Sequence, residues 1–328
     1  MHPQIQAQDL RKTYIVRKSS ASALKRFFRP QRQDVEALRG VSFSIGEGEL
    51  VGYIGPNGAG KSTTVKILSG ILRPDGGSVQ ALGMAPWLDR RRYVAHIGVV
   101  FGQRTQLWWD LPARDSFHLL RDIYRVPKND FKTNMDALCD CLNLGPLLDT
   151  PVRQLSLGQR MRCEMAASLL HEPKILFLDE PTIGLDAVSK IAVRAFIKER
   201  NEQRGVTVIL TTHDMDDVEA LCSRVMLIGN GSILMDGSVD MLRDGEHTRI
   251  LIATLQRPLP AHEIFSGMQV NQEGNKVTLT FDSRLTQSAQ LIALLNEHCG
   301  IADLTIERPA IEAVIARHYR DIASGEGA

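Results

Sequence analysis

The chain has 328 residues, of which 43% are hydrophobic and 23% charged, and its formal net charge is +1. This composition is that of a globular protein, so it argues against a disordered chain, and the balanced charge gives no reason to expect a nucleic-acid partner. The five cysteines show no zinc or disulfide spacing. Neither a signal-peptide pattern nor an apolar run of about 18 residues is present. We therefore expect a cytoplasmic protein that acts at a membrane only through a partner.

The first motif in chain order is a phosphate-binding loop. Leu50–Ile54 reads as an apolar strand, and the sequence GPNGAGKS follows it before an apolar-periodic helix. The pattern G-x-x-x-x-G-K-S lets successive backbone N–H groups wrap a phosphate chain. We expect Lys61 to reach the terminal phosphates and the Ser62 hydroxyl to bind Mg²⁺. The alternative is a glycine-rich turn with an incidental lysine. The nucleotide-binding residues predicted here are Gly55, Asn57, Gly58, Ala59, Gly60, Lys61, Ser62 and Thr63.

The second motif places two acids at the end of another strand. Ile175–Leu178 is a continuous apolar run, which is typical of a strand buried on both faces in a parallel sheet. Asp179 follows and can hold Mg²⁺, directly or through water. We expect Glu180 to point to the other side of the strand and to accept a proton from an attacking water. The alternative is a strand that ends in a solvated acidic turn.

A third apolar strand, in the segment VTVILTTHD, ends at His213. An imidazole at the carboxyl end of such a strand can contact the terminal phosphate or the attacking water. A lone histidine is usually a surface or capping residue. Here three strand ends converge on one chemistry, so we predict a functional role for His213.

The segment QLSLGQRM, at 154–161, looks like the start of a helix with serine and glycine at its tip. Such a tip suits a phosphate, because unpaired N–H groups and the positive end of the helix dipole point outward together. Ser156 can also be a plain N-cap, which is compatible with either role.

Taken in order, GPNGAGKST, FGQ, LSLGQ, ILFLDEP, GLD and TTH resemble the motifs of the ATP-binding subunit of an ABC transporter. The resemblance covers about residues 4–237 and implies ATP hydrolysis with Mg²⁺. It implies an α/β fold, with a P-loop ATPase core, an antiparallel β subdomain and a helical subdomain at about 104–170. We expect the ATP-binding domain to span 1–240 and a small C-terminal α/β accessory domain to span 241–328.

The resemblance also assigns roles that spacing alone does not give. Gln103 corresponds to the glutamine that senses Mg²⁺ and phosphate and connects to the membrane subunit. Asp186 matches the aspartate of the loop after the acidic motif, and Tyr14 lies where the family places an aromatic ring against adenine. The catalytic residues implied are Lys61, Gln103, Glu180 and His213, and the Mg²⁺ ligands implied are Ser62, Gln103 and Asp179.

In this family the LSLGQ tip serves the nucleotide of a second subunit. Two subunits meet head to tail, so Ser156, the Gly158 N–H and Gln159 are expected to bind the nucleotide held by the partner's loop. Leu157 replaces the family's glycine, which keeps the backbone N–H but excludes glycine-only conformations. We expect a working site with altered local packing in a homodimer. A heterodimer with a related subunit is the alternative.

Two segments are candidates for contact with a membrane or a membrane subunit. Trp108 and Trp109 are adjacent, so we expect one ring to pack inside and the other to line a groove for a helix of the permease. The alternative is that both rings belong to the core. The basic insertion at about 17–34 carries Phe27 and Phe28. It either lies near anionic headgroups or forms a solvated loop.

The tail contains three predicted strands (TRILIATL, KVTLTF and IADLTIERP) and two predicted helices (SAQLIALLNEH and AIEAVIARHYRDI). The tail segment DLTIERPAIEAVIARHY resembles that of ATP-binding subunits of ABC-2-type exporters. The segments FGQRTQLWWDLP and TPVRQLSLGQRMRCEMAASLLH resemble a branch of suspected drug or viologen exporters. The resemblance implies an ATPase subunit, peripheral on the inner face of the cell membrane, that powers export through separate ABC-2-type permease subunits.

The export function has three alternatives. An importer ATPase differs only in its partner. A soluble ABC ATPase acting on nucleic acid or the ribosome would carry a long coiled coil or a second ATPase domain, and the spacing from Gln103 to Ser156 leaves no room for a coiled coil. A binding module without turnover would not need Glu180 and His213 together.

Overall fold

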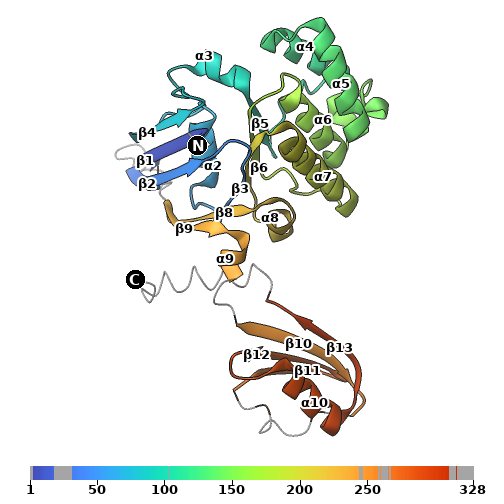
Figure 1. Cartoon of the computed structure of the whole chain (residues 1–328). Helices are drawn as coiled ribbons and strands as arrows, with labels where there is room; N and C mark the ends of the chain where they lie inside the picture. Colours follow the sequence, from blue (N-terminus) through green and yellow to red (C-terminus); the bar gives the residue numbers. More distant parts are fainter. Residues whose placement is uncertain are drawn as a thin grey trace, which may run out of the picture. The chain divides into compact units, whose positions relative to one another are not determined.

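A computed structural model describes residues 3–17, 32–102, 104–243, 247–257, 259, 265, 267–309 and 315 (Figure 1). The chain divides into two compact units, residues 1–239 and 240–328. Each unit has a hydrophobic core of its own. The α/β architecture predicted from the sequence is confirmed.

Within the described residues, the central sheet of the first unit has six strands in the order β5-β6-β7-β3-β8-β9. All of them are parallel except β9. Strands β3 and β7 are buried along their whole length, which explains why they read as continuous apolar runs. The carboxyl ends of the parallel strands meet at one edge, where open α/β sheets bind their ligands. The strands are β3 (Leu50–Ile54), β5 (Ile97–Phe101), β6 (Ile175–Asp179), β7 (Thr207–Thr211), β8 (Arg224–Gly229) and β9 (Ser232–Ser238).

A second, antiparallel sheet contains β1 (Ile5–Arg17), β2 (Arg32–Ile45) and β4 (Gly76–Ala81) in the order β2-β1-β4. Arg17 pairs with Arg32 at the far end of the β1–β2 ladder. Residues 18–31 of the predicted basic insertion, Phe27 and Phe28 included, lie outside the described residues.

Helices cover the central sheet and form a separate helical region (Figure 1). Helix α2 follows β3 directly, whereas α4 and α5 lie with α6 away from the antiparallel sheet. Helix α7 begins at an aspartate N-cap and ends before a glycine with φ 64, which are typical start and stop signals. The helices are α2 (Lys61–Leu68), α3 (Arg90–Tyr93), α4 (Ala113–Tyr124), α5 (Lys128–Leu142), α6 (Leu157–Leu169), α7 (Ala187–Arg204) and α8 (Met215–Leu221). Single 3₁₀ turns are η1 (Val94–His96), η2 (Gly145–Leu147) and η3 (Val152–Gln154).

The second unit begins at Asp240, inside α9 (Val239–Arg243). Its described strands form an antiparallel sheet in the order β11-β12-β10-β13. The predicted strands and the first predicted helix are present, and the polar strand β11 was not foreseen. The second predicted helix lies outside the described residues except for Ile315. The elements are β10 (Thr248–Leu255), β11 (Gln269–Glu273), β12 (Lys276–Asp282), α10 (Ser288–Cys299) and β13 (Ile301–Glu307).

None of the helices in the described ranges combines the length and the apolar character needed to cross a membrane.

Candidate nucleotide site

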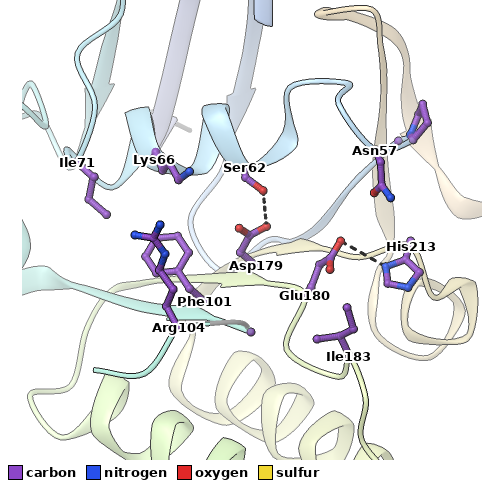
Figure 2. Close-up of a pocket in the computed structure, with 13 residues that line it drawn as sticks. Asn57, Ser62, Lys66, Ile71, Phe101, Arg104, Asp179, Glu180, Ile183 and His213 are labelled. Atoms are coloured by element: carbon purple, nitrogen blue, oxygen red, sulfur yellow. Dashed lines mark hydrogen bonds and ion pairs between the residues drawn. The ribbon is translucent and has the colours of Figure 1, made fainter. Parts of the chain in front are cut away.

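A cleft of about 790 Å³ lies at the carboxyl edge of the central sheet. It brings together residues that follow β3, β5, β6 and β7, although these strands are far apart in the sequence (Figure 2). Asn57, Ser62, Asp179, Glu180 and His213, which the sequence predicted for the site, all line it. The described residues that line it are Gly55, Pro56, Asn57, Ser62, Lys66, Ile71, Phe101, Gly102, Arg104, Asp179, Glu180, Ile183 and His213.

The loop between β3 and α2 has the backbone shape that its glycines permit. Gly60 is the N-cap of α2 with a left-handed φ of 111, and a Cβ there would lie 2.6 Å from the carbonyl oxygen of Ala37. Gly58 is also left-handed, with φ 82. Only glycine adopts such conformations at little cost. The loop therefore leads directly into the N-terminus of α2, and a helix N-terminus is a ready anion-binding arrangement.

The side chain of Lys61 is buried inside this loop. Its Nζ donates to the carbonyl oxygens of Gly55, at 2.6 Å, and Pro56, at 3.2 Å. Burial lowers the pKa of Lys61, while the nearby carboxylates of Glu180 and Asp179 act in the opposite direction. Lys61 is therefore not among the described residues that line the cleft.

Asp179 is surrounded by hydroxyl groups. Its Oδ1 accepts a hydrogen bond from Ser62 at 3.2 Å and another from Thr211 at the end of β7. A carboxylate beside hydroxyl oxygens is the kind of donor set that Mg²⁺ prefers, so Ser62 and Asp179 fit a magnesium ion. Gln103, the third predicted ligand, lies outside the described residues.

Glu180 and His213 form a pair at one side of the cleft. Glu180 Oε1 lies 3.3 Å from His213 Nδ1, and the two side chains are 21% and 58% exposed (Figure 2). Glu180 has a left-handed φ of 55, and its N–H donates to the carbonyl of Thr211 at 2.9 Å. We expected Glu180 to point away from Asp179. The left-handed turn breaks the strand alternation and brings both acids into one cleft.

The backbone after β5 contacts the backbone after β6 directly. The N–H of Gly102 donates to the carbonyl of Asp179 at 2.8 Å. A Cβ on Gly102 would lie 2.3 Å from the carbonyl oxygen of Glu180, so only glycine fits here.

The LSLGQ tip begins α6 with a complete capping box. Gln159 N–H donates to Ser156 Oγ at 3.2 Å, and Ser156 N–H donates to Gln159 Oε1 at 2.9 Å. Leu157 is the first helical residue and has no positive φ, which explains why glycine can be replaced there. Gly158 is different, because a Cβ would lie 2.5 Å from Ser189 Oγ. Ser156 is exposed and is not among the described residues that line the cleft.

Asp186 and Tyr14 both lie near the site without lining the cleft. Asp186 is the N-cap of α7 and accepts from the N–H and the hydroxyl of Ser189, each at 2.9 Å. These hydrogen bonds lower the pKa of Asp186. The Tyr14 hydroxyl lies 3.4 Å from that of Thr63, the residue after Ser62 on α2.

Several cleft residues carried no sequence signal. Lys66 and Ile71 follow the loop motif, and Arg104 follows Gln103, but no local pattern marks them as lining residues. Phe101 opens the FGQ motif but was given no role of its own. Lys66 and Arg104 add two cations at the end of the cleft away from His213 (Figure 2).

The expectation that one tryptophan packs inside is wrong. Trp108 is 39% exposed and Trp109 is 48% exposed. Leu111 follows Trp108 in a tight turn, its N–H donating to the Trp108 carbonyl at 3.1 Å, so the backbone is not extended here. The guanidinium of Arg160, on α6, lies 5.6 Å from the centre of the Trp109 ring. Both rings are therefore available at the surface beside the LSLGQ helix.

Comparisons with known proteins identify the family of the chain. The family model "ABC transporter" matches residues 38–183. The chain is 31% identical over 227 residues to the ABC transporter ATP-binding protein NatA of Bacillus subtilis (strain 168), covering 69% of this chain and 92% of NatA. It is 29% identical over 289 residues to the daunorubicin resistance ATP-binding protein DrrA3 of Streptomyces coeruleorubidus, covering 86% of this chain and 90% of DrrA3.

Two further matches come from an importer and from a solved structure. The methionine import ATP-binding protein MetN 2 of Burkholderia mallei (strain ATCC 23344) is 35% identical over 237 residues, which are 70% of this chain and 60% of MetN 2. The dimeric ATP-binding cassette MJ0796, bound to ADP and Pi, superposes with a TM-score of 0.61 at 25% identity. That match covers 72% of this chain and 98% of MJ0796.

The loop, the acidic strand end and the paired histidine, on this sheet, define an ATP-hydrolysing P-loop cassette. The chain belongs to the ATP-binding proteins of the ABC transporter family, and it binds and hydrolyses ATP. Cassettes of this family work as dimers together with membrane permease subunits.

Proposed function

We propose that this chain powers export through separate ABC-2-type permease subunits. This proposal is supported mainly by the alignment with DrrA3, which is named as a daunorubicin resistance protein. At 289 residues it is longer than the first unit of 239 residues, so it includes part of the second unit. The alignment with the importer protein MetN 2 covers 237 residues and does not require the second unit. An importer ATPase remains the second candidate, favoured by the higher identity of that match.

We propose the following roles for the residues at the cleft, supported by the placement of Ser62, Asp179, Glu180 and His213 in its lining. Lys61 and the backbone of Gly58–Gly60 hold the phosphates, and Ser62 and Asp179, with Gln103, hold Mg²⁺. Bound Mg²⁺ supplies charge neutralisation on the phosphates. Glu180 would take a proton from the attacking water, and its 3.3 Å contact with His213 would orient the imidazole for contact with the terminal phosphate.

We further propose that two copies complete each other's sites. The exposed tip at Ser156, with Gly158 and Gln159, closes over the γ-phosphate held by the other copy, and Asp186 lies at the same interface. The support is that Ser156 lies outside the described lining of its own chain's cleft, and that MJ0796 is dimeric. Tyr14 holds the adenine ring in its own copy.

The permease is proposed to dock beside the exposed rings of Trp108 and Trp109. Exposed aromatic side chains are favoured anchors of interfaces, and these two follow the cleft residues Phe101 and Arg104 in the chain. Such docking would hold the chain on the inner face of the cell membrane.

The direction of transport is tested in inside-out vesicles that contain this chain and its permease. ATP-dependent accumulation of a fluorescent lipophilic drug inside such vesicles is the result expected for an exporter. ATP-dependent release of preloaded solute would instead indicate an importer.

The hydrolytic assignment is tested by Glu180→Gln. The substitution keeps the size of the side chain and removes the base, so turnover should fall at least about a hundredfold. Binding of ATP, measured by titration, should survive. Glu202→Gln is the matched control, because Glu202 is an exposed acid with only a weak ion pair to Lys198 at 3.9 Å. Normal turnover in Glu180→Gln would remove Glu180 from this role.

A further inference from the structure

A buried carboxylate lies behind the Glu180–His213 pair. Asp217, on α8, is 0% exposed. Its Oδ2 accepts a hydrogen bond from the hydroxyl of Thr182 and another, at 3.2 Å, from the hydroxyl of Thr212. Thr182 is two residues after Glu180, and Thr212 directly precedes His213. One carboxylate oxygen therefore joins the two backbone segments that carry the catalytic pair.

The other oxygen of Asp217 joins this point to α7. Its Oδ1 accepts a hydrogen bond from Arg194 Nε at 2.6 Å. Arg194 Nη2 also lies 3.5 Å from Asp214 Oδ1, and Lys190 pairs with the second oxygen of Asp214. Lys190 and Arg194 of α7 thus form a chain of ion pairs with two acids at the start of α8, Asp214 and Asp217. The helix that they hold begins at Asp186.

We propose that Asp217 is a positioning residue for ATP hydrolysis. It fixes the Thr182 and Thr212 segments relative to each other and so holds Glu180 and His213 at their 3.3 Å separation. The proposal rests on the roles proposed above for Glu180 and His213. Positioning matters because a misplacement of about 1 Å can cost roughly a hundredfold in rate.

The burial and the hydrogen bonds of the donors to Asp217 indicate that it positions the Glu180 and His213 segments and does not only fill space. Thr182 is 2% exposed and Thr212 is 1% exposed, and both hydroxyls converge on Asp217. The Thr212 hydroxyl also contacts the backbone of Asp214, the N-cap of α8, accepting from its N–H at 2.9 Å. A buried carboxylate with three side-chain donors has little freedom to move. The backbone segments attached to those donors are held equally firmly.

Single-hydroxyl variants test the proposal with little loss of packing. Thr182→Val and Thr212→Val each remove one donor to Asp217 and keep the shape of the side chain. Thr212→Val also removes the acceptor of the Asp214 N–H, so Thr182→Val is the more specific of the two variants. We expect kcat to fall roughly ten- to a hundredfold, as a misplaced base does, with the KM for ATP changed by less than about threefold. Thr182→Ser keeps the hydroxyl and should restore kcat. Asp217→Asn, which removes the charge, should show the same split between kcat and KM.

Thr207→Val is the matched control. Thr207 is also fully buried, and its hydroxyl accepts from Gly48 N–H at 2.8 Å, but it lies at the opposite end of β7 from the cleft. The melting temperature of Thr207→Val should fall as that of Thr182→Val does, while its kcat stays at the wild-type value. Equal losses of kcat in Thr207→Val and Thr182→Val would overturn the proposal, because a loss of stability alone would then explain both.

The outcomes separate this proposal from the proposed function. Full turnover in Glu180→Gln would remove the catalytic pair itself. An inactive Glu180→Gln together with wild-type kcat in both Thr182→Val and Thr212→Val would overturn only the role of Asp217. The threonine variants keep the test decisive if Asp217→Asn does not fold.

Discussion

The hydroxyl of Tyr14 lies 3.4 Å from the hydroxyl of Thr63, so strand β1 of the antiparallel sheet reaches the helix that follows the phosphate-binding loop. Loss of this ring in Tyr14→Ala should remove roughly 1–3 kcal/mol of adenine stacking. That is about ten- to a hundredfold in ATP affinity, measured by calorimetric titration. Tyr14→Phe keeps the ring and should bind ATP nearly as the wild type does. An unchanged affinity in Tyr14→Ala would mean that another residue holds the base.

If each copy's LSLGQ tip completes the site of the other copy, two inactive variants should restore each other's activity in a mixed dimer. Ser156→Asp keeps a good N-cap for α6, so the helix should stay stable, but its carboxylate would repel a phosphate. Lys61→Ala removes the cation of the loop. Each variant alone should be inactive, whereas a mixture of the two should recover ATP hydrolysis, because a mixed dimer has one complete site.

The complementation result depends on folded, pairing variants. Melting temperature and ATP-dependent dimerisation of each variant, measured by size-exclusion chromatography, are the controls. A mixture that stays inactive although both variants fold and pair would contradict the exchanged tip.

The exposed tryptophans predict a specific loss of permease binding. Trp108→Ala and Trp109→Ala together should weaken co-purification with the permease from detergent at least about tenfold, as loss of interface anchors does. Leu88→Ala is the matched control, because Leu88 is an apolar residue of the same unit that is 75% exposed. Equal recovery of permease by the two variants would place the interface elsewhere.

His171 predicts a pH dependence of stability. Its ring stacks on Tyr124 at 3.8 Å, its Nε2 donates to the carbonyl of Ile97 at 2.9 Å, and within the described residues its buried Nδ1 has no partner. Burial lowers the pKa of His171 from 6.5 to about 4. Because the fold favours the neutral ring, this stability is complete above pH 6.5 and is lost as the pH falls to about 4. The loss is on the order of 3 kcal/mol.

Urea unfolding at several pH values checks the His171 prediction. His171→Phe keeps an aromatic ring against Tyr124 but cannot take up a proton. Its free energy of unfolding should be lower at pH 7 and should change less between pH 7 and pH 4 than that of the wild type. Identical pH dependences would assign the titration to other groups.

The parts of the site that lie within one short segment could be predicted from the sequence. The loop from Gly55 to Ser62 and the pair Asp179–Glu180 follow strands that are apolar along their length, because a parallel sheet covered on both faces buries every side chain. The strand ends could therefore be placed at one edge, and the structure brings Ser62, Asp179 and His213 together there.

The parts that depend on distant segments could not be predicted. The lining by Ile71 and Arg104 depends on how the loops after α2 and β5 meet, and no local pattern encodes that. The left-handed backbone of Glu180 was missed because a glutamate carries no preference for it. Asp217 was not singled out in the sequence, because no local pattern distinguishes it from a surface acid near the start of a helix. Its burial becomes visible only when Thr182 and Arg194 are placed around it.

The contact between Gly102 and the segment after β6 has a mechanical consequence. Its N–H is bonded to the Asp179 carbonyl, and there is no space for a side chain between Gly102 and the Glu180 peptide. A change of side-chain rotamer therefore cannot separate these two segments, because they meet through main-chain atoms alone. A displacement of Gly102 would be passed directly to the peptide of Glu180.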